Sequence, residues 1–333
     1  MKKYDVVIIG AGPAGLRAAE ILAKAGKGVV VLEKDSTIGN KICAEGITRK
    51  DLPLIPKEAI ERKFDSYVGH SRLFTAVVKT KRPYIFTINR KKLGQIMAMK
   101  ARKAGAKILL KNKVTEITNS YIVSNNKKFY FKCLIGADGS NSLVRRHLKL
   151  PFETYKTLGF ILNKNVRDIE AFPRIYKNGW GYFSIFPNGN YAKVGVATNS
   201  RFVSLEKELD GFCKKLNIKK SGLVSFPINY CYKGHEFGNI FLAGDAAGLA
   251  SELTGEGIYV AIISGEDIAK KIIDKTYDYK GIRLILDIKK KHRKLLKILT
   301  FNRFFSSIIL EILILAAKNL RIARLFKNRF KIL

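Results

Sequence analysis

The pattern of apolar and polar residues near the N-terminus changes period twice. Residues 6–9 form an apolar, β-branched run, typical of a strand buried on both faces of a parallel sheet. Residues 13–25 instead carry charged side chains along one stripe and apolar ones around the rest, as in a helix that lies on a sheet. A second apolar run follows at residues 29–32. The pattern therefore predicts a strand, a helix and a strand in succession.

The turn between the first strand and the helix has the glycine spacing of a dinucleotide-binding site. Gly10 allows the tight turn, Gly12 lets the backbone approach a pyrophosphate, and Gly15 lets helix and strand pack closely. Glu33 follows the second strand, where a carboxylate accepts hydrogen bonds from both ribose hydroxyls of an adenosine. The motif predicts a dinucleotide at the helix N-terminus rather than a simple glycine-rich turn. By itself it does not separate FAD from NAD.

Further along the chain, the pattern predicts additional helices and strands. A helix is expected at residues 90–104 and a strand at 107–110, and short alternating strands follow from residue 114. Residues 152–232 read as mostly antiparallel sheet with dense aromatic residues. Those aromatic side chains form either a core or the wall of an apolar pocket.

Two further strand ends carry an aspartate beside a glycine. Asp138 follows one predicted strand and Asp245 follows a second, buried one. The segment 253–258 then opens a helix that runs to about residue 274. Its glycine-rich start leaves backbone amides bare, and such a start stabilises negative charge, for instance that of an anionic reduced flavin ring.

The C-terminal part, residues 281–333, reads as two helices. The first has a lysine-rich face, and the second is apolar over residues 304–317 before it becomes basic. This apolar stretch contains Glu311 and is too short to span a bilayer. It is therefore either a packing helix or an interfacial helix whose Lys and Arg side chains meet lipid head groups.

Charge and composition narrow the class of partner. The chain has 62 Lys and Arg against 27 Asp and Glu, a net charge of +35 that is spread along its whole length. Such a charge first suggests nucleic acid, but no helix-turn-helix, zinc-finger, RRM or KH pattern is present. An anionic membrane surface or an acidic protein is the better expectation. We expect no signal peptide, because the first strand begins at Tyr4.

The cysteines and histidines show no spacing typical of a disulfide framework or a metal site, so a reducing cytoplasm and no metal are expected. Cys43 lies in a glycine-punctuated loop, residues 34–48, near the carboxyl edge of the predicted sheet. Ligands of parallel sheets bind at that edge. Cys43 either faces the site or is a small buried residue without chemistry.

Three separated motifs together resemble the FAD-dependent oxidoreductases of the p-hydroxybenzoate hydroxylase fold. They are the glycine turn at 10–15, Gly-Ala-Asp-Gly-Ser-x-Ser-x-Val-Arg at 136–145, and Gly-Asp-Ala-Ala-Gly at 244–248. Within that group the chain is similar to the geranylgeranyl reductase family, including the archaeal digeranylgeranylglycerophospholipid reductases. The similarity rests on Lys-Ile-Cys-Ala-Glu-Gly-Ile at 41–47, Leu-Thr-Gly-Glu-Gly-Ile at 253–258, and the Tyr-x-x-x-Phe-Pro and Val-Gly-Val motifs at 182–187 and 194–196.

The resemblance implies FAD as the cofactor and gives a role to each matching position. The implied FAD-binding residues are Gly10, Gly12, Ala14 and Gly15 at the pyrophosphate, Glu33 at the ribose, Ala44 and Gly46 beside the flavin, Arg90 at the phosphates or ribityl chain, Val114 at the adenine, Asp138 in support of the pyrophosphate motif, Asp245 at the ribityl chain, and Gly257 and Ile258 at the pyrimidine end of the ring. Cys43 and Tyr182 are the candidate catalytic residues.

Some positions depart from the patterns of these families. Gly248, Glu252 and Tyr259 stand where the aromatic hydroxylases of this fold have His, Pro and Asn, which argues against a monooxygenase. Ser251 and Glu252 replace the Asn-Pro that the reductases usually have. Ser184 replaces their usual tryptophan, which enlarges the expected substrate pocket and leaves the exact substrate open.

The predicted function is FAD-dependent reduction of isoprenoid carbon–carbon double bonds, in geranylgeranyl chains of archaeal-type ether lipids or in geranylgeranyl diphosphate. Reduced flavin N5 would deliver hydride to one alkene carbon, and a proton would reach the other. An unactivated alkene offers no oxyanion, so few polar catalytic residues are expected. The alternatives are a flavin-dependent monooxygenase of an apolar or aromatic compound, and a non-catalytic flavoprotein or basic lipid-binding module.

The resemblance, together with the basic charge and the cysteine pattern, gives expectations for partners, location and domain order. The electron donor would be NAD(P)H or an acidic, ferredoxin-like protein, and the location cytoplasmic with peripheral contact to the inner face of the membrane. The expected fold class is α/β, with a Rossmann-type FAD-binding domain, an antiparallel substrate domain and C-terminal helices. The expected boundaries are 1–66, 88–150 and 235–276 for the FAD-binding domain, 67–87 and 151–234 for the substrate domain, and 277–333 for the basic helical segment.

Overall fold

A computed structural model describes residues 2–41 and 43–319 of the chain. The helices are α1 (Pro13–Lys24), η1 (Arg49–Leu54), η2 (Lys57–Ala59), α2 (Arg90–Lys103), α3 (Leu143–His147), α4 (Leu205–Lys215), η3 (Gly244–Ala247), α5 (Ile258–Ile273), α6 (Lys280–Thr300) and α7 (Arg303–Ala317). The strands are β1 (Lys2–Ile9), β2 (Val29–Leu32), β3 (Gly46–Thr48), β4 (Ile60–Phe64), β5 (Ser66–His70), β6 (Thr75–Lys79), β7 (Ile85–Ile88), β8 (Lys107–Leu109), β9 (Val114–Ile117), β10 (Tyr121–Ser124), β11 (Lys127–Gly136), β12 (Thr154–Leu162), β13 (Glu170–Tyr176), β14 (Gly179–Asn188), β15 (Tyr191–Thr198), β16 (Ile228–Asn229), β17 (Glu236–Phe237) and β18 (Ile240–Leu242).

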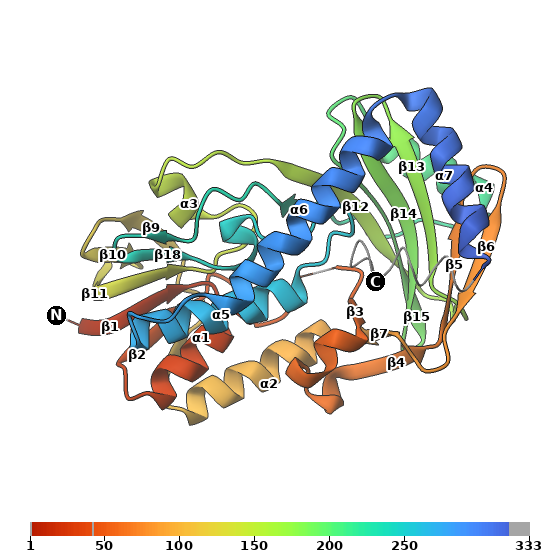
Figure 1. Ribbon diagram of the computed structural model, residues 1–333. Coiled ribbons are helices and arrows are strands. Elements are labelled where there is room, and N and C mark those ends of the chain that lie inside the picture. Colours follow the sequence, from red (N-terminus) through yellow and green to blue (C-terminus); the bar gives the residue numbers. More distant parts are fainter. Residues whose placement is uncertain (1, 42, 320–333) are drawn as a thin grey trace.

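The N-terminal strands form the centre of a largely parallel sheet. Its strand order is β17-β18-β11-β1-β2-β8, with the β9–β10 hairpin attached to β11. Val6, Val7 and Ile8 of β1 are fully buried, as the uninterrupted apolar run predicted. In Figure 1 this sheet lies on the left with α1, α2 and α5 below it, and α1 contacts both α2 and α5.

A second sheet has seven strands in the order β16-β12-β15-β14-β13-β5-β6. All of its pairs are antiparallel except β13 with β5. One face packs on α4 through Phe160, Phe172, Phe183 and Phe212. The opposite face meets α6, α7 and the loop before α5. A parallel and an antiparallel sheet in one chain, with helices on both, confirm the predicted fold class.

A small third sheet, β3-β7-β4, lies between the two larger ones. Residues 67–87 were expected to belong to the substrate domain. Of these, β5 and β6 do pair with its sheet, whereas β7 pairs with β3 and β4. At the end of the predicted antiparallel region, residues 223–230 form a regular strand only at Ile228–Asn229, with one further bridge between Gly159 and Val224.

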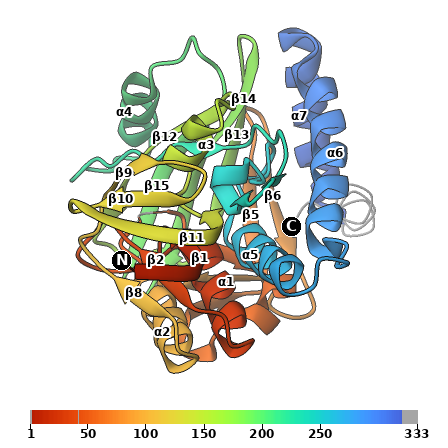
Figure 2. The same ribbon diagram turned by 90° about the vertical axis from the view of Figure 1, so that its left-hand side faces the viewer.

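The two C-terminal helices lie along one side of the molecule, opposite α4 (Figure 2). The chain bends by 117° between α6 and α7. Among the described residues, no single helix is long and apolar enough to cross a membrane.

Candidate flavin site

The glycine turn after β1 is built so that only glycine fits. Gly10 has φ +102°, and a Cβ atom there would collide with the carbonyl of Ala137. A Cβ on Gly15 would collide with the carbonyl of Gly10. Gly12 begins α1 without a side-chain cap, so the amides of the first turn, including that of Ala14, are left for another acceptor. Such a helix start stabilises a pyrophosphate.

Glu33 closes this turn from the neighbouring strand. Its carboxylate accepts hydrogen bonds from the backbone N–H of Ala11 at 2.7 Å and of Asp35 at 3.0 Å. The two amides hold the carboxylate at the carboxyl ends of β1 and β2, beside the glycine turn. This is where the dinucleotide motif predicted the ribose-binding acid to lie.

Asp138 and Asp245 make different contacts, although both lie beside a glycine near a strand end. Asp138 accepts from Ser142 Oγ and the Leu143 N–H, both at 2.6 Å, so it holds the start of α3. Burial raises its pKa. Its position supports the backbone turn after β11 rather than a direct contact with phosphate.

Asp245 joins segments that lie far apart in the sequence. Its carboxylate accepts from Lys41 Nζ at 2.9 Å and from Ser140 Oγ at 3.0 Å, while its carbonyl accepts from Asn229 Nδ2 at 2.9 Å. A Cβ on Gly257 would lie 3.4 Å from the Asp245 carboxylate. Four motifs found separately in the sequence, at 41–47, 136–145, 244–248 and 253–258, therefore meet at one place.

Arg90 supplies the clearest sign of an anionic ligand. It begins α2 and is only 6% exposed, yet its Nε and Nη1 atoms have no hydrogen-bond partner among the described residues. A buried guanidinium with unmatched donors is costly unless an anion meets it. The phosphates or ribityl hydroxyls of FAD fit this need, so the residues present suit the cofactor.

The start of α5 is the second helix start without a side-chain cap. Gly257 is the N-cap residue, Ile258 is the first helical residue, and no side chain bonds to the first amides. Gly255, two residues earlier, has φ +68°. The positive end of the helix dipole is therefore bare at the position that the sequence assigned to the pyrimidine end of the flavin.

Three aromatic side chains of the antiparallel sheet fix the loop before α5. The Tyr155 hydroxyl donates to the carbonyl of Glu252, Trp180 Nε1 donates to that of Leu253 at 3.2 Å, and the Tyr182 hydroxyl donates to that of Thr254 at 3.1 Å. Burial raises the pKa of Tyr182 to about 12. Its proton is thus committed to a carbonyl, a geometry that suits positioning of the flavin loop.

The loop that contains Cys43 packs against Phe186, near the C-terminal end of β14. Cys43 is half-buried and Ala44 is exposed. A Cβ on Gly46 would lie 2.5 Å from the Phe186 ring, so only glycine allows this contact. Burial of Tyr191, and then the charges of Glu45 and Glu61, raise the pKa of Tyr191 to about 12.

Glu45 forms a buried ionic cluster that the sequence analysis did not find. It has φ +60°, its carboxylate lies 2.7 Å from Lys193 Nζ, and it accepts from Asn188 Nδ2 and the Arg90 N–H. Burial raises the pKa of Glu45 despite the lysine. Lys193 in an otherwise apolar strand was the available signal, because a buried lysine needs a partner.

Between these two loops the sheet presents a row of small residues. Antiparallel and parallel registers bring them side by side across β5, β13, β14, β15 and β12: Gly69, Ala171, Ser184, Gly195 and Gly159. We call these five the small-residue row. On β14 it is flanked by Tyr182 on one side and Phe186 on the other, since residues two apart share a face.

Two further expectations concern the adenine contact of Val114 and the binding of metal ions. Val114 is buried at the start of β9, and no described contact assigns it to the adenine. Among residues 2–41 and 43–319, no group of three or more His, Cys, Asp or Glu side chains is arranged to hold a metal ion.

Comparison with known proteins identifies the family. Residues 3–174 match the family model of an FAD binding domain. An uncharacterized protein of Methanosarcina barkeri is 36% identical, over 83% of this chain and 76% of that protein. Digeranylgeranylglycerophospholipid reductase 1 of Methanosphaera stadtmanae is 31% identical (85% and 79%), and geranylgeranyl diphosphate reductase of Rhodobacter capsulatus is 27% identical (80% and 74%).

Solved structures agree on the fold. A geranylgeranyl bacteriochlorophyll reductase-like protein from Thermoplasma acidophilum superimposes with a TM-score of 0.77 at 22% identity, over 99% of this chain and 97% of that one. A p-nitrophenol 4-monooxygenase from Pseudomonas putida gives 0.75 at 17%, over 99% and 98%. The predicted cofactor is confirmed as FAD. The chain belongs to the geranylgeranyl reductase family of FAD-dependent oxidoreductases.

Proposed function

We propose that this oxidoreductase reduces carbon–carbon double bonds in the geranylgeranyl chain of a lipid. The observation that carries the proposal is the small-residue row, which lies between the two loops that border the flavin site. At the usual strand spacing its four intervals span about 19 Å, enough for an extended chain of several isoprene units. The names of the Methanosphaera and Rhodobacter relatives point to the same class of substrate.

The surroundings of the row suit an apolar chain. Ser184 is its only residue with a polar side chain, while Tyr182 and Phe186 provide aromatic walls. Gly159 and Gly195 are half-exposed although they lie within the sheet, so no side chain of this protein covers them fully. A long apolar substrate would gain binding energy here from burial, and the two aromatic rings would restrict its position.

Reduced FAD, when bound, supplies the hydride. The work of the protein is to hold one double bond beside the flavin, exclude water and supply a proton. Arg90, Asp245 and the bare starts of α1 and α5 would hold the cofactor. The three aromatic donors to the loop Glu252–Thr254 would fix the wall on which the ring rests.

Cys43 is the residue we propose at the reacting face. It lies two residues from Glu45 and three from Gly46, in the loop that contacts Phe186 at the edge of the row. Cys43→Ala is expected to lower turnover at least about tenfold if the thiol takes part in proton delivery. Cys133→Ala is the matched control, because Cys133 is also half-buried but lies in β11. Full activity of Cys43→Ala would remove Cys43 from the mechanism.

The electron donor is a separate proposal. Besides the FAD motif the sequence has no second nucleotide-binding motif, and its net charge is +35. Both NAD(P)H and an acidic, ferredoxin-like protein are compatible with these features. Reduction of the bound flavin by each donor, measured anaerobically at low and high salt, separates them, since docking of an acidic protein to a basic surface weakens strongly with salt.

The deciding experiment is anaerobic. The holoprotein is reduced with dithionite and mixed with a geranylgeranylated ether lipid, while flavin absorbance and lipid mass are recorded together. Reoxidation of the flavin with addition of one hydrogen pair to the lipid per turnover is the expected result. Flavin that stays reduced until oxygen enters, followed by an oxygenated product from an aromatic compound, would instead indicate a monooxygenase.

A further inference from the structure

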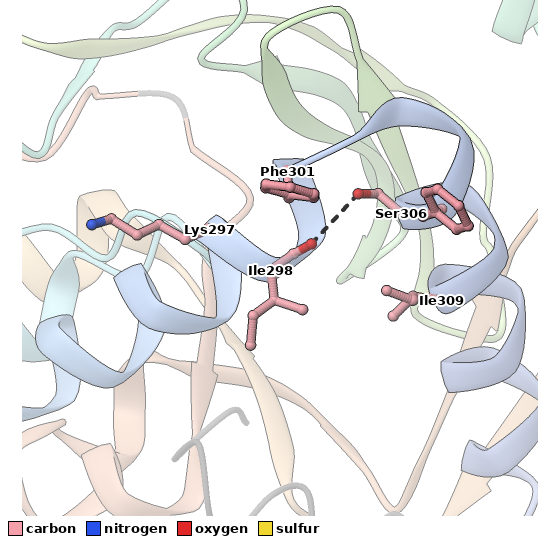
Figure 3. Close-up of a pocket in the computed structure, with 6 residues that line it drawn as sticks. Lys297, Ile298, Phe301, Ser306 and Ile309 are labelled. Atoms are coloured by element: carbon pink, nitrogen blue, oxygen red, sulfur yellow. Dashed lines mark hydrogen bonds between the residues drawn. The ribbon is translucent and has the colours of Figure 1, made fainter.

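The bend between α6 and α7 exposes a group of large apolar side chains. Phe301 is 88% exposed, Phe304 68% and Phe305 60%. We call these three and Ile298 the elbow. A cavity of about 370 Å³ opens between the two helix ends, lined by Lys297, Ile298, Phe301, Phe305, Ser306 and Ile309 (Figure 3). A soluble surface rarely gathers so many exposed aromatic rings without a partner.

The exposed apolar face continues along α7. Ile308, Ile312 and Leu315 lie on its outer side and are each more than two-fifths exposed. Residues spaced by three or four share one face of a helix, so these side chains extend the elbow into a stripe. Figure 1 shows α7 beside β13, β5 and β6, so the stripe lies on the side of α7 away from the sheet.

The inner side of α7 is firmly attached to the protein. Glu311 accepts hydrogen bonds from Ser71 Oγ, from the Arg72 N–H at 2.9 Å and from the Leu73 N–H at 3.2 Å. Ile314 lies against Gly69 at one end of the small-residue row. Glu311, the acid that interrupts the apolar sequence of α7, therefore binds the turn between β5 and β6. The outer stripe contains no charge.

Polar contacts likewise attach α6 to the rest of the protein. Lys289 is buried and donates to the carbonyls of Ala250 at 2.6 Å and Tyr230 at 3.1 Å, and Arg293 pairs with Glu252. Because α6 is fixed to the flavin loop, the bent pair cannot straighten into a membrane span without breaking these contacts. Within the described part of this helix pair, the elbow and the outer stripe of α7 remain available to lipid.

Positive charge surrounds the elbow. Between Ile288 and Lys318 the sequence has a single acid, Glu311, which the turn of β5 and β6 already binds. The exposed cations of this segment are Lys290, Lys291, Arg293, Lys294, Lys297, Arg303 and Lys318. Apolar side chains bordered by lysine and arginine match a membrane interface with anionic head groups.

We propose that the elbow and the outer stripe of α7 insert into one leaflet of an anionic lipid bilayer. The aromatic side chains enter the region between head groups and acyl chains, and the surrounding lysines pair with lipid phosphates. An anionic bilayer fits better than a protein partner because the apolar residues follow one face of a helix and are bordered by cations on α6. The inference stands on these residues alone and does not rest on the proposed function.

This docking also gives the substrate a route. Ile314, on the inner side of α7, packs on Gly69 at one end of the small-residue row, so the helix that would lie in the leaflet also borders the row. The apolar cluster of Trp180, Leu253, Leu299 and Leu310 joins the elbow region to the flavin loop. A lipid substrate would therefore extend its chain from the bilayer toward the flavin site.

The test is flotation of the full-length holoprotein with vesicles of phosphatidylcholine and phosphatidylglycerol in equal amounts. The combined change Phe301→Ser, Phe304→Ser and Phe305→Ser is expected to lower partitioning about a hundredfold, because three large apolar side chains no longer enter the interface. Phe202→Ser is the matched control, since Phe202 is 70% exposed near α4 and away from the elbow. Bound FAD is measured in each variant to show that it is folded.

Two further measurements separate lipid from protein as the occupant. Each of Lys290→Gln, Lys294→Gln and Lys297→Gln should reduce binding roughly fivefold, and binding to pure phosphatidylcholine should be much weaker. In Phe301→Trp, brominated lipid should quench the new fluorophore, whereas the native Trp180 is buried. Unchanged flotation of the triple variant, or no quenching together with a dimer that the triple variant abolishes, would overturn the proposal.

Discussion

The two faces of the seven-stranded sheet are filled in opposite ways. Toward α4, alternate residues of the strands are large and aromatic: Phe183 and Phe212 stack with ring centroids 4.5 Å apart, and Phe172 meets Phe212 edge-on at 4.9 Å. Toward the flavin site, the same strands present the small-residue row. We call these the closed and the open face. One set of strands thus carries a core of aromatic side chains on one side and a row of small residues on the other.

Because successive side chains of a strand point to opposite faces of the sheet, one strand can encode stability on one face and binding on the other. Phe183 and Ser184 are neighbours in sequence but belong to opposite faces, so a change at one has little direct effect on the other. The described buried charged residues near this sheet also lie on the open side, in the Glu45–Lys193 pair and around Glu252. Substitutions on the closed face should therefore alter stability, and those on the open face should alter activity.

The largest effect is expected on the closed face. Phe212→Ala removes a ring that contacts both Phe172 and Phe183, and is expected to lower the free energy of unfolding by about 3–5 kcal/mol. Turnover at a temperature where the variant is folded should stay near the original value. Urea unfolding followed by flavin fluorescence measures the first, and steady-state kinetics the second. A stable but inactive variant would break the distinction between the faces.

The next effect is expected at the centre of the open face. A Cβ on Gly195 would lie 3.3 Å from the carbonyl oxygen of Leu158, so Gly195→Val needs a small local shift of the backbone, and its methyl groups would fill the row. Turnover of a geranylgeranylated lipid should fall about a hundredfold, because the double bond can no longer reach its position. Gly211→Val on the exposed side of α4, where nothing lies within 4 Å, is the control. Normal turnover by Gly195→Val would place the substrate elsewhere.

A smaller effect is expected at the loop that borders the open face. Tyr182→Phe removes the hydrogen bond to the Thr254 carbonyl, worth about 1 kcal/mol, and should weaken FAD binding roughly fivefold. If Tyr182 only positions the loop, turnover at saturating FAD should fall little. Tyr176→Phe, which removes a hydrogen bond to Glu208 near the closed face, should leave FAD affinity unchanged. Complete loss of turnover with normal FAD binding would instead assign Tyr182 a chemical role.

Much of this architecture could be predicted from the sequence because its signals are local. The strand, helix and strand at the N-terminus follow from periodicity within thirty residues, and the glycine turn follows from steric limits at single positions. The alternation in residues 152–198 likewise identified the antiparallel strands. Its dense aromatic residues did not reveal which face would be closed, since that depends on where α4 packs.

What the sequence did not reveal depends on residues that meet from far apart. Glu45 and Lys193 form their ion pair across 148 positions, and the small-residue row needs the register of five strands, two of which pair in parallel. Glu311 looked like an interruption of an apolar helix, but the amides of the β5–β6 turn bind it. Each of these contacts becomes visible only when the sheets are assembled.

The smallest expected effect is on how the melting temperature depends on pH, and it concerns Asp51. Burial, and then the charge of Glu256 in the loop before α5, raise the pKa of Asp51 to about 7. The protonated carboxyl therefore favours the folded state, and this contribution is lost as the pH rises from the pKa of an unfolded aspartate toward 7. Asp51→Asn keeps an acceptor for the Thr48 N–H but cannot ionise. Its melting temperature should gain on that of the original protein between about pH 4 and about pH 7. If the melting temperatures of Asp51→Asn and the original protein instead changed in parallel with pH, the raised pKa of Asp51 would be contradicted.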